Sequence, residues 1–340
     1  MASETRQITL MQAVMRAWVT FNMTTLLRMN VAGEKNIPTR GPLIVAANHL
    51  SGFDGAIVGN YLPPDTEYAA PGDFRLLFPG NLIVAWSRTI RVKRAASLEL
   101  DAVRRMTDIL KGGGILVIFP EGGTWEKPIT DAKTGTVYLS MITQTPILPV
   151  GIGGVYRIWG DVYRLRRPEV SLTFGEVIPP IPTPFRAERD AVLEEATHDL
   201  MRRIYRLLPG PDQQWYDTQE RRRYDVWTEV WRGSEPKMTN LPGRAALGEF
   251  MSKPNLLNPF IKNAGLPLDP LRYPGTRFPP ATVKLAIRSL KSTQSPSLRD
   301  YLEYRLGVEK TRDISDALEG LMGLANDPAV TGITLKPTTR

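Results

Sequence analysis

The residues best suited to chemistry are a histidine and an aspartate five positions apart, in Asn48-His49-Leu50-Ser51-Gly52-Phe53-Asp54. The 340-residue chain contains only two histidines. Imidazole takes up and returns protons near neutral pH, and a nearby carboxylate can fix its tautomer. The string therefore predicts that His49 is a general base and that Asp54 orients it.

The same string also fits an ordinary helix start. Ser51 would cap a helix that begins near Gly52, with Asp54 at its third position. His49 would then be a loop residue without a chemical role. The motif alone leaves both interpretations open, so the surrounding elements must decide.

Two apolar runs predict buried strands that deliver candidate residues to one edge of a sheet. Residues 43–47 end at His49, and residues 115–119 end at Pro120-Glu121-Gly122-Gly123-Thr124. Ligands of parallel α/β sheets bind outside the carboxyl ends of the strands. Glycines let a backbone approach a ligand closely, although Gly122-Gly123 also fits a plain tight turn.

A third candidate is a run of cations in Ile90-Arg91-Val92-Lys93-Arg94, at the end of a short predicted strand. Clustered cations suit a phosphate, and arginine offers it two parallel hydrogen bonds. A solvated basic edge is the alternative interpretation.

The pattern along the chain predicts an α/β fold with a mostly parallel central sheet flanked by helices, because strands and helices alternate. We expect strands at 43–47, 89–93, 115–119, 146–152 and 169–177, and a strand or helix at 81–86. We expect helices at 53–62, 97–111, 186–208, 216–232, 281–291 and 297–325. Residues 234–280 are rich in proline and glycine and show no clear period.

The N-terminal segment 8–28 predicts an amphipathic helix that either lies on a membrane surface or covers the core. We expect neither a signal peptide nor a membrane span, since no apolar run approaches twenty residues. The predicted organisation is a membrane-surface helix at 1–30, a catalytic domain at 31–232, and a mainly helical and irregular extension at 233–340.

Composition removes several classes of chemistry. The chain has no cysteine, which excludes disulfides and thiol nucleophiles, and two histidines argue against a metal centre. The net charge of +8 favours anionic partners such as lipid or phosphorylated substrates. No zinc-finger, zipper or aromatic RNA-binding motif points to nucleic acid.

Taken together, these strings resemble the glycerolipid acyltransferases of the lysophosphatidic acid acyltransferase type. Four blocks follow the family's order over about residues 8–208. They are His49-(four residues)-Asp54, Val92-Lys93-Arg94, Phe119-Pro120-Glu121-Gly122 and Pro146-Ile147-Leu148-Pro149-Val150. Residues 33–38 also resemble the strand that precedes the family's first block.

The resemblance implies a glycerol-3-phosphate acyltransferase-like fold and transfer of an acyl group from acyl-CoA or acyl carrier protein to a lysophospholipid. The expected acceptor is 1-acylglycerol-3-phosphate. By family match Arg94 would hold its phosphate, assisted by Arg91 and Lys93, and Glu121 and Gly122 would position its glycerol part. We expect no cofactor beyond the acyl donor, no metal, and a peripheral position on the cytoplasmic face of an anionic membrane.

Two departures from the family pattern affect the acceptor site. Gly123 is added before Thr124 in the third block, where the family's usual arginine is missing, and Lys93 adds a charge before Arg94. A glycolipid or aminolipid acceptor is therefore an alternative. A hydrolase using Ser51 and a non-catalytic lipid-binding protein are two further ones. His198, on the charged helix 186–208, is expected at the surface.

Overall fold

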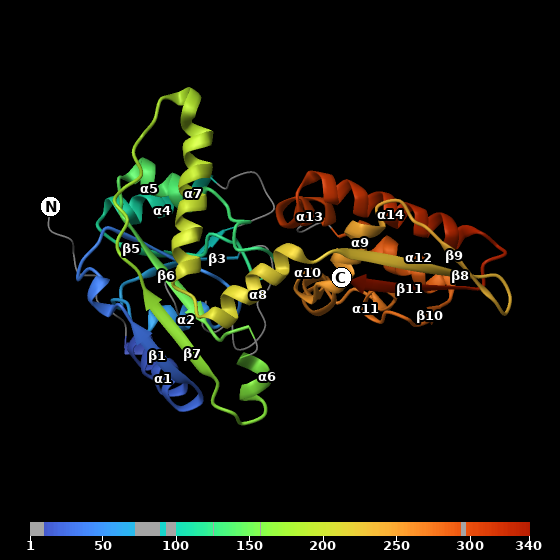
Figure 1. The fold of residues 1–340 in the computed structure, drawn as a ribbon, viewed down its shortest axis with the longest axis horizontal. Helices are drawn as coiled ribbons and strands as arrows, with labels where there is room; N and C mark the ends of the chain where they lie inside the picture. The colour runs from blue at the N-terminus through green and yellow to red at the C-terminus, as the bar shows by residue number, and fades with distance from the viewer. Residues whose placement is uncertain (1–9, 72–88, 93–99, 125, 157, 294–296) are drawn as a thin grey trace. The chain divides into compact units, whose positions relative to one another are not determined.

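The computed structural model describes residues 10–71, 89–92, 100–124, 126–156, 158–293 and 297–340. By their contacts, these residues form two compact units that divide between Glu220 and Arg221 (Figure 1). The candidate residues around His49 all belong to the first unit.

A seven-stranded sheet forms the centre of the first unit, in the order β1-β7-β6-β2-β5-β3-β4. Its strands are β1 (Arg28–Ala32), β2 (Leu43–Ala47), β3 (Glu67–Pro71), β4 (Thr89–Val92), β5 (Ile115–Ile118), β6 (Ile147–Gly153) and β7 (Glu169–Phe174). Every neighbouring pair is parallel except β6 and β7. The predicted α/β class with a mostly parallel sheet is confirmed.

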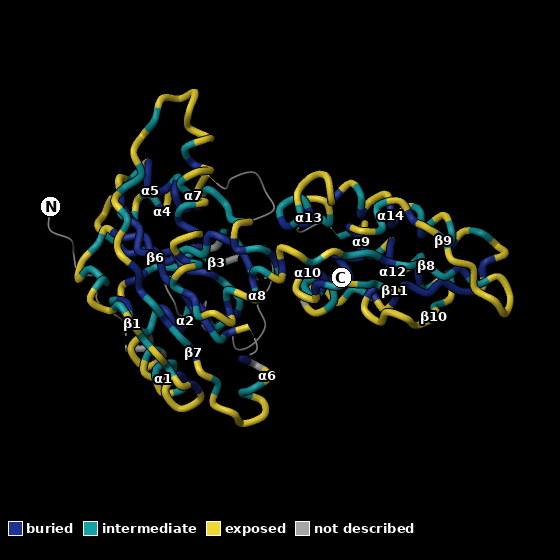
Figure 2. Tube along the Cα trace, viewed as in Figure 1, coloured by how far each residue is buried: buried dark blue, intermediate teal, exposed yellow. Residues whose placement is uncertain are grey.

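Helices cover both faces of this sheet. They are α1 (Leu10–Leu26), α2 (Asp54–Gly59), α4 (Leu100–Lys111), α5 (Gly135–Thr143), α6 (Ile158–Val162), α7 (Arg189–Arg206) and α8 (Gly210–Arg221), with 3₁₀ turns at Glu34–Asn36 and Arg186–Glu188. Alternate residues of β2 pack into two different apolar clusters: Val45 belongs to one cluster and Ile44 belongs to the other. Strands buried on both faces read as continuous apolar runs, which is why 43–47 was recognisable. The strands accordingly run through the buried interior (Figure 2).

Helix α1 has two apolar faces. Met23, and Leu27 just after the helix, pack into the core with residues of α2, whereas Val14, Trp18, Phe21 and Leu26 are 42–66% exposed. The helix therefore covers the core, as one interpretation predicts, and it also presents apolar side chains to solvent; its position on a membrane surface stays a prediction. Within the described residues, no helix is both long enough and apolar enough to cross a bilayer.

Some local predictions in the first unit need correction. Residues 33–38 do not form a strand, because Gly33 turns the chain with a φ of 76° and a 3₁₀ turn follows. A Cβ at Gly33 would lie 2.0 Å from the carbonyl oxygen of Phe174, so only glycine fits there. Strands β1 and β3 were not predicted. Residues 81–86, Lys93 and Arg94 lie outside the described residues.

The second unit contains a four-stranded antiparallel sheet, in the order β10-β11-β8-β9. Its strands are β8 (Tyr224–Trp231), β9 (Pro236–Thr239), β10 (Arg277–Phe278) and β11 (Gly332–Thr339). Its α-helices are α9 (Arg244–Ser252), α10 (Pro254–Asn258), α11 (Asp269–Arg272), α12 (Pro280–Lys291), α13 (Leu298–Leu306) and α14 (Val308–Asn326), and a π-helical turn spans Pro259–Asn263.

The helix predicted at 216–232 is wrong beyond Arg221. Residues 224–231 form β8, in which Val226, Thr228 and Val230 are buried while the residues between them are half-buried. That alternation has the period of a strand, and β8 pairs with both β9 and β11. The helix predicted at 297–325 is also divided, because Gly307 has a φ of 86°.

Candidate active site

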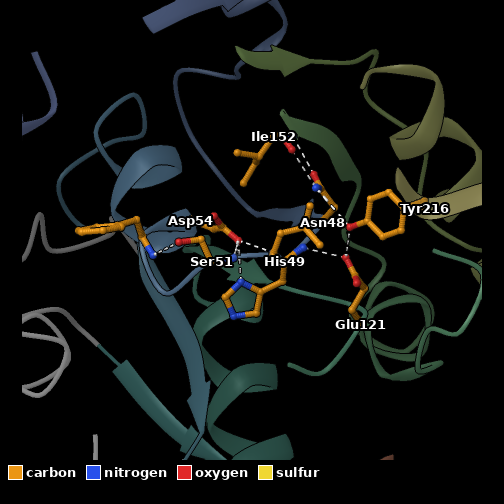
Figure 3. Close-up of polar contacts among 9 residues, drawn as sticks. Asn48, His49, Ser51, Asp54, Glu121, Ile152 and Tyr216 are labelled. Atoms are coloured by element: carbon orange, nitrogen blue, oxygen red, sulfur yellow. Dashed lines mark hydrogen bonds and ion pairs between the residues drawn. The ribbon is translucent and has the colours of Figure 1, made fainter. Parts of the chain in front are cut away.

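The chain leaves β2 through a loop that holds His49 against Asp54 (Figure 3). Nδ1 of His49 lies 2.9 Å from Oδ2 of Asp54, which is the first residue of α2 and is fully buried. Because an ionised carboxylate only accepts, this contact selects the tautomer of a neutral imidazole in which Nδ1 carries the proton and Nε2 keeps its lone pair. The imidazole is 18% exposed, and none of the described residues offers a hydrogen bond to Nε2. This geometry suits a general base.

Asp54 also folds the loop that carries its partner. The same Oδ2 accepts hydrogen bonds from the backbone N–H groups of Leu50, at 2.7 Å, and Ser51, at 2.8 Å. The Ser51 hydroxyl in turn accepts from Phe53 N–H at 3.3 Å. The predicted Ser51 cap is wrong, because α2 begins at Asp54 and its N-cap residue, Phe53, makes no side-chain capping bond. The helix's first acid instead binds both the loop backbone and the imidazole.

Phe119, just after β5, stacks on the imidazole. The two ring centroids are 4.1 Å apart and the planes differ by 19°. One face of His49 is therefore covered by an apolar ring, which limits how the imidazole can rotate. The parallel pairing of β2 with β5 brings these two strand ends together, as predicted from the two apolar runs.

Glu121 holds the backbone of the same histidine. Its Oε1 accepts from His49 N–H at 2.7 Å and from the Tyr216 hydroxyl at 3.0 Å. The carboxyl group is fully buried, and this burial raises its pKa to about 7, although the nearby Lys127 charge and the His49 N–H lower it. Oε2 is buried with no hydrogen-bond partner among the described residues. Asp54 thus binds the imidazole of His49, and Glu121 binds its backbone N–H.

Asn48 and Tyr216 complete this buried network (Figure 3). Nδ2 of Asn48 donates to the carbonyl oxygen of Ile152 at 2.9 Å, and Ile152 N–H donates to Oδ1 at 2.7 Å. Nδ2 also lies 3.4 Å from the Tyr216 hydroxyl. Burial first, and then the neighbouring Glu121 charge, hold the pKa of Tyr216 well above its usual value, so the hydroxyl keeps the proton that it donates.

The loop after β5 is fixed by a buried lysine and a glycine turn. Lys127 is 1% exposed, and its Nζ donates to the carbonyl oxygens of Glu121, at 2.8 Å, and Asp131. Gly122 has a φ of 74° and donates its N–H to Phe119 at 2.9 Å. Gly123 is buried and Thr124 is half-buried. Gly122 therefore closes a tight turn over residues 119–122 that contains Glu121, and Gly123 follows this turn.

The structure brings together some of the predicted site residues. His49, Asp54, Glu121 and Gly122 converge at the ends of β2 and β5, with Gly123 and Thr124 in the same loop. Arg91 is in β4, where it pairs with Ala70. Lys93 and Arg94 lie outside the described residues, so the phosphate site stays a prediction. Among the described residues, no three potential metal ligands gather at one point. His198 is exposed on α7, as predicted.

Sequence reasoning missed Tyr216 and Lys127 and gave Asn48 no role. Tyr216 lies 95 residues from Glu121 and 168 from Asn48, and no spacing rule connects positions that far apart. Lys127 follows Glu121 by six residues and had no apolar context to mark it as buried. The contact of Glu121 with an acceptor's glycerol part stays a prediction.

Residues 28–153 match the family model described as Acyltransferase. The resemblance to the acyltransferase family is confirmed for these residues. The matched segment runs from β1 to the end of β6 and includes His49, Asp54 and Glu121.

Curated relatives of this acyltransferase segment include two named 1-acyl-sn-glycerol-3-phosphate acyltransferase. The Saccharomyces cerevisiae protein is 27% identical over 142 residues, 40% of this chain and 46% of that protein. The Borreliella burgdorferi protein is 28% identical over 131 residues, 36% of this chain and 50% of that protein. An uncharacterized Mycobacterium leprae protein is 28% identical over 171 residues, 46% of this chain and 45% of that protein. The chain thus spans half or less of the length of these relatives.

A solved structure also aligns with the chain. The lysophosphatidic acid acyltransferase PlsC of Thermotoga maritima matches 56% of this chain and 78% of its own, with 23% sequence identity and a TM-score of 0.41.

Proposed function

We propose that the protein transfers a fatty acyl group from an acyl thioester to the hydroxyl of a lysophospholipid, with 1-acylglycerol-3-phosphate as acceptor and phosphatidic acid as product. The observation that carries the proposal is the His49–Asp54 pair. Its Nδ1 is bound to a buried carboxylate, and its Nε2 is available at the carboxyl end of β2. The match of residues 28–153 to the acyltransferase family supports the reaction class.

In the proposed reaction Nε2 of His49 takes the proton from the acceptor hydroxyl. At the same time the hydroxyl oxygen attacks the carbonyl carbon of the thioester. Asp54 stabilises the imidazolium that forms. The tetrahedral oxyanion collapses, the carbon–sulfur bond breaks, and the thiolate leaves with the proton from Nε2. The nucleophile belongs to the substrate, so the enzyme is not acylated, which agrees with a chain that has no cysteine.

Binding of the acceptor rests on the family match. Arg94 is assigned to the phosphate, with Arg91 and Lys93 assisting it, since guanidinium groups bind phosphate bidentately. Glu121 and Gly122 are assigned to the acceptor's glycerol part, and Gly123 and Thr124 in the same loop are further candidates for acceptor binding. For Glu121 the contacts support a further role as a positioning residue, because its carboxylate fixes the backbone of His49. Acyl-CoA and acyl carrier protein are both candidate donors.

A lipid acceptor other than 1-acylglycerol-3-phosphate is the second candidate. The added Gly123 favours it, because this residue is buried in the loop that the family match places beside the acceptor. A hydrolase using Ser51 has less support, since this serine is buried and its hydroxyl already accepts from Phe53 N–H.

The proposed site of action is a membrane surface, where these lipid substrates reside. The exposed apolar face of α1 and the net charge of +8 give a physical route for binding an anionic bilayer. We propose a peripheral enzyme on the cytoplasmic face.

The deciding experiment is product identification. The purified full chain is incubated with labelled acyl-CoA, or with acyl carrier protein carrying the same acyl group, and with a panel of phosphorylated and unphosphorylated lysolipids. We expect labelled phosphatidic acid. Equal rates on both kinds of acceptor would overturn the phosphate assignment, and free fatty acid formed without any acceptor would indicate a hydrolase. Arg94→Ala should raise the Michaelis constant for the acceptor more than it lowers turnover.

A further inference from the structure

The loop between α6 and β7 combines exposed apolar side chains with arginines. Tyr163 and Leu165 are 78% and 93% exposed, and Arg164 and Arg166 are exposed beside them. Backbone hydrogen bonds from Leu165 N–H to Val162 and from Arg166 N–H to Asp161 fix the turn. Leu165 has a φ of 55°, in the left-handed region that costs energy for a side chain of its size. A defined turn thus presents a leucine to solvent.

This loop is fastened to the end of α1. The guanidinium of Arg167 donates to the carbonyl oxygens of Thr24, at 2.7 Å, and Leu27, at 3.0 Å. Arg28, the first residue of β1, donates its N–H to Pro168 at 2.9 Å. The loop therefore lies against the C-terminal end of α1, and α1 and α6 are drawn at the same end of the first unit (Figures 1 and 2).

We propose that residues 163–166 form a second membrane contact, which inserts into the interface of an anionic phospholipid bilayer. This inference rests on the proposed membrane docking of α1. Tyrosine and leucine partition into the boundary between headgroups and acyl chains, while arginines beside them reach the lipid phosphates.

Charge favours a bilayer as the occupant of this surface. The loop and the strand beside it carry Arg28, Arg164, Arg166 and Arg167 against two acids, Asp161 and Glu169. An anionic leaflet attracts each such cation, and two apolar tips alone are too small for a stable protein interface. The contact also has a geometric effect. A single helix lying flat on a surface can roll about its own axis, and a second contact beside its end fixes that rotation.

A fluorescence experiment tests the proposal directly, because the chain contains no cysteine that would compete for a thiol-reactive label. An environment-sensitive fluorophore is attached through Leu165→Cys, Phe21→Cys or Phe185→Cys, each in the full chain. Phe185 is 83% exposed in the segment between β7 and α7, which runs at the opposite end of the first unit from α1 (Figure 1). The probes are vesicles of phosphatidylcholine alone and of equimolar phosphatidylcholine and phosphatidylglycerol.

We expect labels at 165 and 21 to shift to blue emission on the mixed vesicles, and the label at 185 to stay in water. A shift at 21 without one at 165 would overturn the loop contact while leaving the membrane docking of α1 intact. No shift at either position would overturn both. A shift at all three would mean non-specific adsorption and would also contradict the proposal.

Partition measurements with unlabelled variants separate the apolar and cationic parts. Tyr163→Ser with Leu165→Ser should lower the partition coefficient on mixed vesicles about tenfold. Arg164→Gln with Arg166→Gln should lower it roughly 10- to 30-fold on mixed vesicles and leave phosphatidylcholine binding unchanged. The matched controls are Phe185→Ser and Arg186→Gln with Arg189→Gln, where we expect no change. Losses of equal size in the test and control variants would overturn the proposal.

Discussion

Two buried glutamates, one in each unit, have pKa values that are shifted in opposite directions. In the second unit Glu249 accepts from Nζ of Lys253 and Nζ of Lys310, each at 2.6 Å. Burial raises the pKa of Glu249, but the two ammonium groups outweigh it and the pKa is lowered. In the first unit Glu121 receives only neutral donors through its carboxylate, and burial raises its pKa to about 7.

The difference in pairing indicates that Glu249 stabilises the fold, whereas Glu121 is a candidate functional residue. A buried carboxylate that is fully paired contributes to folding, whereas one left uncompensated costs stability and persists where the site requires it. Two fully buried carboxylates that contact His49, those of Asp54 and Glu121, each have one oxygen without a hydrogen-bond partner among the described residues. This comparison predicts that replacing Glu249 by its amide lowers stability, that the same change at Glu121 removes a cost to stability at neutral pH, and that loss of His49 lowers activity.

The largest expected effect is on turnover in His49→Ala. Loss of a general base should lower kcat by ~10²–10⁴-fold while acyl-donor binding and the free energy of unfolding change little. Initial rates with acyl-CoA and the acceptor measure it. His198→Ala, on the exposed face of α7, is the matched control and should keep full activity. Equal rates for His49→Ala and His198→Ala would contradict the assignment of His49 as the general base.

Next in size is the stability effect of Glu249→Gln. The substitution leaves the buried Lys253 without its carboxylate, and half-exposed Lys310 loses less, so we expect a loss of about 2–4 kcal/mol. Hydrogen exchange in peptides from α9 and α14 reports on this unit separately. Since the pKa of Glu249 is lowered, its contribution is present above the ordinary value of 4.5 and is lost as pH falls further. Unchanged exchange would contradict the structural role.

Glu121→Gln should raise the stability of the first unit at neutral pH, whereas Glu249→Gln lowers that of the second. In the folded chain Glu121 keeps its proton at pH values where the unfolded chain has lost it. Its contribution to stability is therefore present below pH 4.5 and is lost as pH rises to about 7. The amide variant should remove this loss, about 3 kcal/mol, from the stability profile of the first unit. A profile that matches the unsubstituted chain between about pH 4 and about pH 8 would contradict the raised pKa.

The smallest effect is expected for Tyr216→Phe, which removes one donor to Glu121. We expect a stability loss of about 1 kcal/mol and a roughly fivefold fall in kcat, with KM unchanged, because His49 is less well positioned. Tyr301→Phe is matched to it, since this buried hydroxyl donates to the carbonyl oxygen of Leu256 in the second unit. Tyr301→Phe should lower stability alone. If both variants lowered kcat equally, Tyr216 would be merely structural.

Local patterns predicted the parts of the site that are local in sequence. Strands β2 and β5 are continuous apolar runs, and the five-residue spacing of His49 and Asp54 fits within one loop. The alternation of Val226, Thr228 and Val230 has the period of a strand, whereas the surrounding arginines and tryptophans of residues 216–232 also fit a helix, so the local pattern did not predict β8. Strands β1 and β3 lie at or near the sheet's edges and are less uniformly apolar.

Contacts between residues far apart in the chain could not be predicted from the sequence. Tyr216 contacts Glu121 only because α8 returns to the carboxyl ends of β2 and β5, and no property of residues 210–221 predicts that path. A single sequence also shows no difference between the paired Glu249 and the unpaired Glu121, because compensation depends on which side chains the fold brings near.

The Tyr216 contact has a consequence for the order in which the site is assembled during synthesis. The segment that carries His49 and Asp54 leaves the ribosome first. Glu121 emerges 72 residues after His49, and Tyr216 a further 95 after that. The stacking of Phe119 and the Glu121 bond to His49 therefore wait for the segment that forms β5, and the last hydrogen bond to Glu121 waits for translation of Tyr216.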